Sequence, residues 1–106
     1  MRLLLDECVD ERLRHLLGDH DCQTARYAGF AGLRNSDLIS AAEAAGFDVI
    51  VTVDQNMPTQ QNLRRWRIAF VILCAVTNRL GDLKPLVPAA LRALDSIQPG
   101  ELVRVR

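Results

Sequence analysis

The segment that most constrains the fold of this 106-residue chain is FDVIVTVD, residues 47–54. It is almost continuously apolar and rich in β-branched side chains, a pattern typical of a strand that is covered on both faces. Parallel strands need crossover connections, and those connections place helices on both faces of a sheet. The segment therefore predicts the central strand of a parallel sheet, and with it an α/β fold.

Shorter segments predict the remaining elements of this fold. We expect strands at residues 2–6, 67–76 and 102–106, with a weaker strand within residues 22–29. Apolar side chains at helical spacing predict helices over residues 9–19 and 85–97, and another from Ser36, its expected N-cap, to Gly46. A short helix over residues 59–66 completes the alternation. The order predicts one domain, residues 1–106, with three α/β/α layers and a mostly parallel sheet of about five strands.

Composition narrows the functional classes. Thirteen basic residues balance thirteen acidic ones, so any binding to nucleic acid or to an anionic surface must come from a local patch. The three cysteines are far apart and lack C-x-x-C spacing, which indicates reduced thiols rather than a disulfide framework or a zinc site. The apolar run near the N-terminus has only three residues, too few for a signal peptide or a membrane span. We expect a cytoplasmic protein with no membrane partner.

Carboxylates follow two of the predicted strands. Asp6 and Glu7 come after the first strand, and Asp54 comes after the central one. Parallel strands deliver such residues to one edge of the sheet, where two carboxylates about 4 Å apart would repel by roughly 4 kcal/mol at an effective dielectric near 20. A hard divalent cation, Mg²⁺ or Mn²⁺, relieves that repulsion and prefers oxygen ligands. The pattern predicts a metal site with Asp6 and Asp54 as ligands and the Asn56 amide as a weaker one.

Two further acids belong to the second predicted helix. Asp37 lies at its start and Glu43 two turns later, so either is a candidate to lean toward the same edge of the sheet. Each acid also has a simpler structural role. Asp6 is suited to cap a helix, Asp37 to complement a helix dipole, and Asp54 to close an Asx turn.

Three motifs carry a resemblance to a known family. They are LLLDE at residues 3–7, AGFAGLRNSDLISAA at residues 28–42 and VIVTVDQNMPTQQNL at residues 49–63. Their order and spacing resemble the small PIN-like domains formerly catalogued as a domain of unknown function. The resemblance covers nearly the whole chain, is strongest over residues 1–63 and fades after Cys74.

The resemblance implies a PIN-type nuclease fold and an activity. Such nucleases hold Mg²⁺ or Mn²⁺ with three or four acids and hydrolyse single-stranded RNA. Many are toxins partnered by an antitoxin protein, and they form homodimers. By position, Asp6, Asp37 and Asp54 match the family's catalytic acids. Many relatives have another acid where this chain has Asn56.

That departure bears on catalysis, because an amide binds a cation more weakly than a carboxylate and cannot act as a base. Cleavage with one ion remains open, with Asp37 acting on the attacking water. The alternative is a module that keeps the fold and binds RNA or a protein without cleaving. A receiver-like phosphoacceptor domain is disfavoured, because it needs a Lys after its fifth strand and Lys84 follows Thr77 too closely.

Basic residues near the acidic loop are candidates to bind RNA phosphates. Arg64 and Arg65 follow that loop closely, and Arg34 and Arg79 are further candidates. Trp66, in the same RRWR stretch, is expected to anchor the core rather than to stack on a base.

Overall fold

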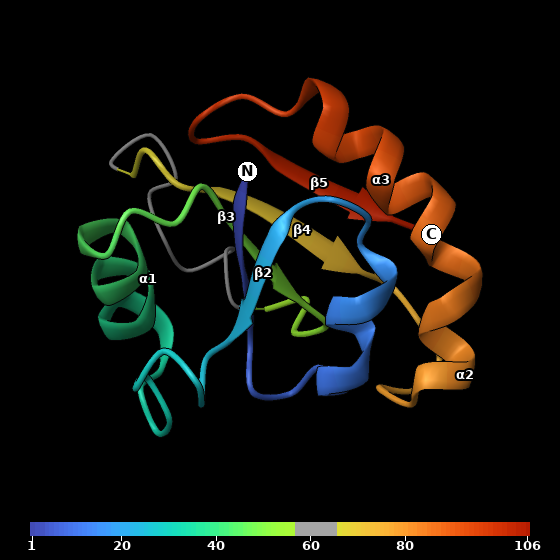
Figure 1. Ribbon diagram of the computed structural model, residues 1–106, viewed down its shortest axis with the longest axis horizontal. Helices are drawn as coiled ribbons and strands as arrows, with labels where there is room; N and C mark the ends of the chain where they lie inside the picture. Colours follow the sequence, from blue (N-terminus) through green and yellow to red (C-terminus); the bar gives the residue numbers. More distant parts are fainter. Residues whose placement is uncertain (57–65) are drawn as a thin grey trace.

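A five-stranded parallel sheet organises the part of the chain that the structure, a computed structural model, describes: residues 1–56 and 66–106 (Figure 1). The strand order is β2-β1-β3-β4-β5, and every neighbouring pair is parallel. This confirms the α/β prediction, with β3 at the centre and β5 at an edge. The strands are β1 (Arg2–Leu5), β2 (Asp21–Thr24), β3 (Val49–Thr52), β4 (Ala69–Leu73) and β5 (Leu102–Val105).

The strand order reverses between β1 and β3. From β1 the chain first adds β2 on one side, then returns to add β3, β4 and β5 on the other. In open parallel sheets a crevice forms at this reversal, outside the carboxyl ends of the strands. The fold therefore places its most suitable ligand position between the ends of β1 and β3.

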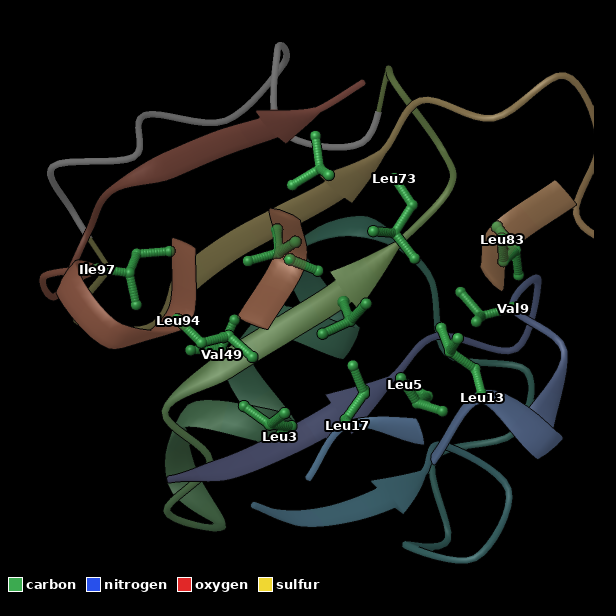
Figure 2. Close-up of a cluster of buried hydrophobic side chains, with 14 of the residues drawn as sticks. Leu3, Leu5, Val9, Leu13, Leu17, Val49, Leu73, Leu83, Leu94 and Ile97 are labelled. Atoms are coloured by element: carbon green, nitrogen blue, oxygen red, sulfur yellow. The ribbon is translucent and has the colours of Figure 1, made fainter. Parts of the chain in front are cut away.

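Helices cover both faces of the sheet, which gives three layers. Helix α1 (Asn35–Ala44) packs on one face, while α2 (Leu80–Leu83), α3 (Val87–Ser96) and the 3₁₀ helix η1 (Glu11–Leu16) pack on the other. A second 3₁₀ helix, η3 (Lys84–Leu86), joins α2 to α3. Figure 2 shows the core on the α3 face, where Leu3 and Leu5 of β1 belong to the same buried cluster as Leu13 of η1 and Leu94 of α3. Leu4, between Leu3 and Leu5, belongs to the α1 face. This alternation follows the two-residue period of a strand.

Helix α1 ends as predicted but begins differently. At its C-terminus, Gly46 has φ +85°, its N–H donates to the Glu43 carbonyl, and the Phe47 N–H donates to the Ala42 carbonyl. This is a Schellman motif, which needs a residue that tolerates positive φ. The predicted N-cap Ser36 is wrong, because the helix starts at Asn35 after the extended Arg34, whose side chain makes no capping bond.

The segment predicted as a helix over residues 9–19 is shorter and of another type. Only Glu11–Leu16 are helical, in a 3₁₀ conformation, after an N-cap at Asp10. Gly18, at φ +67°, turns the chain soon afterwards. Fewer than two turns of α-helix fit between these boundaries, and short helical pieces often adopt the tighter 3₁₀ form. The predicted helix over residues 59–66 lies outside the described residues, apart from Trp66, which is partly buried against the α1-face core as expected.

No helix in the two described stretches has both the length and the apolar character needed to span a membrane. All three cysteines are free and partly buried.

Candidate functional site

A cavity of about 690 Å³ opens at the carboxyl ends of β1 and β3, where the strand order reverses. Two of the three predicted catalytic acids, Asp6 and Asp54, line it. Glu7, Cys8 and Arg34 also line the cavity, together with the apolar side chains of Leu33, Leu38 and Val53. The sheet therefore brings two strand-end carboxylates to one opening, as the sequence pattern predicted.

Asp6 is held by both its backbone and its side chain. Its N–H donates to the Val51 carbonyl (3.0 Å), which continues the pairing of β1 with β3 beyond the end of the strand. Its Oδ1 accepts the Glu7 N–H at 2.8 Å, and its Oδ2 accepts the Thr52 hydroxyl at 2.8 Å. The carboxylate is thereby fixed in orientation at the rim of the cavity.

Thr52 connects the two acids. Its hydroxyl donates to Asp6 and accepts the Asp54 N–H at 3.0 Å, so one oxygen ties the end of β1 to the turn after β3. With 0% exposure, it is the only polar residue buried within the described part of the chain. Sequence reasoning missed this residue. The sequence feature that could have identified Thr52 is a hydroxyl side chain in an otherwise apolar strand, two positions before an acid.

Asp54 lies at the surface in the turn that follows β3. Its Oδ1 accepts the Asn56 N–H at 2.9 Å, which is the Asx turn expected as the simple structural role of this acid. This turn holds Asn56 close to the carboxylate that it was predicted to assist. Both residues are exposed.

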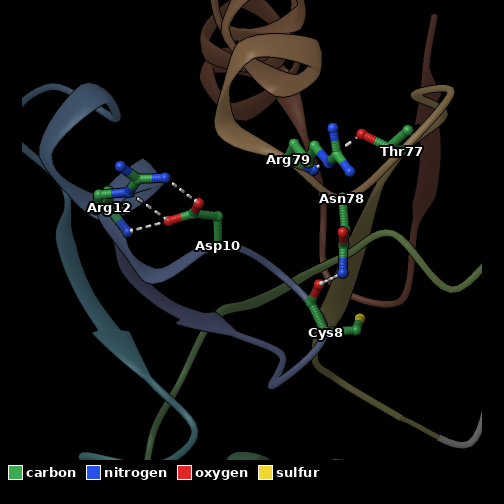
Figure 3. Close-up of polar contacts among 6 residues, drawn as sticks. All are labelled: Cys8, Asp10, Arg12, Thr77, Asn78 and Arg79. Atoms are coloured by element: carbon green, nitrogen blue, oxygen red, sulfur yellow. Dashed lines mark hydrogen bonds and ion pairs between the residues drawn. The ribbon is translucent and has the colours of Figure 1, made fainter.

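Cys8 lies beside the acids and is unsuited to nucleophilic attack. Its Sγ is 3.5 Å from Asp6 Oδ2 and 3.5 Å from Thr52 Oγ1. Burial raises the pKa of the Cys8 thiol above its ordinary value, and the Asp6 carboxylate adds to that rise. The thiol therefore stays protonated near neutral pH. Figure 3 shows the Asn78 side chain donating to the Cys8 carbonyl (3.1 Å), which ties the loop after β4 to the turn after β1.

The remaining predicted acids are placed differently from one another. Glu7 lines the cavity, and its Oε1 accepts the Gly32 N–H at 2.6 Å. Asp37 is exposed in the first turn of α1 and does not belong to the cavity lining. Glu43 lies at the opposite edge of the sheet, where its carboxylate accepts the Arg67 N–H at 2.9 Å beside a separate cavity of about 380 Å³. Glu43 therefore does not lean toward the candidate site.

The predicted phosphate-binding arginines have different outcomes. Arg34 lines the cavity just before α1, and no carboxylate of the described residues lies within 4.0 Å of its guanidinium. Arg79 is exposed before α2, and its backbone N–H donates to Thr77 Oγ1 at 3.1 Å (Figure 3). Arg64 and Arg65 lie outside the described residues.

The donor set suits a single hard cation. Over residues 1–56 and 66–106 no group of three or more His, Cys, Asp or Glu side chains is arranged to hold a metal ion. Mg²⁺ in proteins usually takes one or two carboxylates and completes its shell with water and substrate phosphate. Two carboxylate donors at one cavity, with an amide close to one of them, meet that smaller requirement.

No family model, curated protein or solved structure matches this chain.

Proposed function

We propose that this protein is a metal-dependent ribonuclease that cleaves single-stranded RNA at the cavity between β1 and β3. One observation supports the proposal most. Asp6 and Asp54 follow adjacent parallel strands, line the same cavity and are linked through the buried Thr52 hydroxyl. A buried side chain that orients one carboxylate and anchors the turn that carries another is typical of the support around a metal-binding group.

In this proposal Asp6 and Asp54 hold one Mg²⁺ or Mn²⁺, and Asn56 supplies a weaker oxygen ligand. When bound, such an ion would offset the charge of the two acids and stabilise the negative charge on the phosphate and the leaving oxygen. The free guanidinium of Arg34 donates hydrogen bonds to a phosphate oxygen from the α1 side of the cavity.

Glu7 replaces Asp37 as the acid that orients the attacking water. Glu7 lines the cavity, whereas Asp37 does not. Its Oε1 is held by the Gly32 N–H, which fixes the carboxylate and leaves Oε2 to accept a hydrogen bond from water. The family resemblance alone supports three further parts of the proposal: the protein is a toxin with an antitoxin partner, it forms a homodimer, and it acts in the cytoplasm.

A second candidate function is a module that binds RNA or a protein without cleaving. Two observations favour it: an amide occupies position 56, and Asp37 does not line the cavity. The receiver-like alternative receives no support, because Lys84 begins η3, between α2 and α3, rather than following β5.

The test of this proposal is cleavage of a mixed single-stranded RNA pool by the purified protein, with Mn²⁺, with Mg²⁺ or with EDTA. We expect cleavage with a metal, none with EDTA, and recovery when metal is added back in excess. Intact RNA in both metals, from protein that binds Mn²⁺ and RNA, would reject the nuclease in favour of the binding module.

A further inference from the structure

The cavity lined by Asp6 is the first of three neighbouring cavities that share lining residues in series. It shares Asp6 and Glu7 with a second cavity of about 370 Å³. The second cavity in turn shares residues with a third, of about 250 Å³, lined by Glu11, Arg14, Thr24, Arg26 and Tyr27. We call these five residues the outer groove. Their side chains come from η1 and from the end of β2 with the loop that follows it.

Residues 25–34 form the loop that follows β2 (Figure 1). Hydrogen bonds within the loop and to the end of β2 fix its conformation. The Tyr27 N–H donates to Thr24 Oγ1 at 3.1 Å, and the Phe30 N–H donates to the Ala25 carbonyl at 2.8 Å. Phe30 also packs edge-on against Phe47, with ring centroids 6.3 Å apart. The loop thus has its own anchors in the core, yet it leaves the Tyr27 side chain 77% exposed. An aromatic ring presented on a fixed turn is suited to stack with a planar partner.

The charge of the outer groove, with two arginines and one acid, favours a phosphate-bearing partner. Arg14 and Arg26 line the outer groove and Arg34 lines the cavity with Asp6. The side-chain ion pairs within the described residues are Arg2–Asp21 and Arg12–Asp10, so these three guanidinium groups have no carboxylate partner within 4.0 Å. An unpaired guanidinium presents a planar fork that matches phosphate oxygens. Glu11 is the single acid of the outer groove.

We propose that the outer groove binds the nucleotides of single-stranded RNA that continue from the cleavage position, with Tyr27 stacking on a base and Arg26 and Arg14 binding phosphates. This rests on the proposed ribonuclease function and adds to it the path of the substrate. Alternating aromatic and basic groups along a groove are how proteins bind single strands without reading their sequence. Double-stranded RNA offers no unstacked base to Tyr27 and should bind more weakly.

The test is binding of a fluorescein-labelled 12-nucleotide single-stranded RNA in EDTA, measured by anisotropy so that cleavage plays no part. We expect Tyr27→Ala to weaken binding by about fivefold or more, because base–aromatic stacking is lost. Tyr27→Phe should bind like wild type, since the ring alone stacks. Arg26→Ala should lower the slope of log affinity against log salt by about 0.7. Glu11→Gln should strengthen binding by removing a repulsive charge.

Arg92→Ala is the matched control, because it removes the same charge from the exposed face of α3, outside every one of these cavities. Equal affinity of wild type, Tyr27→Ala and Arg26→Ala would overturn the outer groove. Absence of measurable RNA binding by wild type would also overturn it. Metal-dependent cleavage of a trinucleotide is a separate readout of the proposed function. If Tyr27→Ala binds normally while wild type cleaves, the groove is refuted and the nuclease stands.

Discussion

The buried hydroxyl of Thr52 offers the sharpest perturbation of the site. Thr52→Val keeps the shape of the side chain and removes its one oxygen. Two short hydrogen bonds are then lost, the one donated to Asp6 Oδ2 and the one accepted from the Asp54 N–H, together with the longer 3.5 Å contact to Cys8 Sγ. Asp6 and the turn that carries Asp54 lose their common anchor, while the core around β3 keeps its packing.

The magnitude follows from these two bonds. A hydrogen bond to a charged group contributes about 1.5–3 kcal/mol and one between neutral groups about 0.5–1.5 kcal/mol. Asp6 is half-buried and Asp54 exposed, so water replaces part of the loss and values near the lower limits apply. The methyl group that replaces the hydroxyl in Thr52→Val is buried, which stabilises the variant by about 0.8 kcal/mol. The free energy of unfolding should fall by about 1 kcal/mol.

Thr52→Ser is the matched control. It keeps the hydroxyl and removes a buried methyl group, which also costs about 1 kcal/mol. The two variants should therefore be similarly stable in urea unfolding but differ at the site. Thr52→Val should lower Mn²⁺ affinity or the rate of RNA cleavage by about 10- to 100-fold, as loss of a partner that orients a metal ligand does. Thr52→Ser should keep both properties near wild type. Equal activity of the two variants would refute the role assigned to the hydroxyl.

Three other predictions concern separate groups. Asp37→Asn should lower the cleavage rate by less than about tenfold and Glu7→Gln by more, because of these two acids only Glu7 lines the cavity. If a rate assay gives the reverse order, Asp37 is the water-orienting acid. Burial raises the pKa of the Cys22 thiol from 9.0 to about 11. At pH 8 iodoacetamide should therefore alkylate Cys22 about 100-fold more slowly than a cysteine in the unfolded chain. Equal alkylation rates, measured by mass spectrometry, would contradict this prediction. Hydrogen bonds from Arg12 lower the pKa of Asp10 from 3.8 to about 2. Because this pKa is depressed in the folded state, its stabilising contribution is complete above pH 3.8 and is lost as the pH falls through about 2. An NMR titration of Asp10 with a midpoint near 3.8 would disprove that shift.

The predictions that succeeded depended on residue patterns within single strands. The continuous apolar run at residues 47–54 placed β3 at the centre of the sheet. Asp6 and Asp54 were predicted to meet because both follow parallel strands, which fixes the edge that they share. These inferences need only the period and direction of a strand.

Predictions that depend on the relation between elements were less successful. The bond from Thr52 to Asp6 depends on the register of β3 against β1, which the sequence does not encode locally. The positions of Asp37 and Glu43 depend on how α1 is set against the sheet. One lies in the first turn of that helix, outside the cavity, and the other reaches the opposite edge of the sheet. The 3₁₀ conformation of η1 likewise reflects its short span between Asp10 and Gly18 rather than the spacing of its leucines.

The most direct test of the central claim compares two Asp→Asn substitutions at opposite ends of β3. Asp54 follows the strand at the cavity, whereas Asp48 precedes it at the other edge, where its carboxylate accepts the Arg2 N–H at 2.8 Å. Both side chains are exposed, and both substitutions remove one charge and almost no volume. With saturating Mn²⁺ and single-stranded RNA, Asp54→Asn should lower the cleavage rate by at least about 100-fold and Asp48→Asn should cleave like wild type. Equal rates for the two variants would contradict a metal site at the carboxyl edge of the sheet.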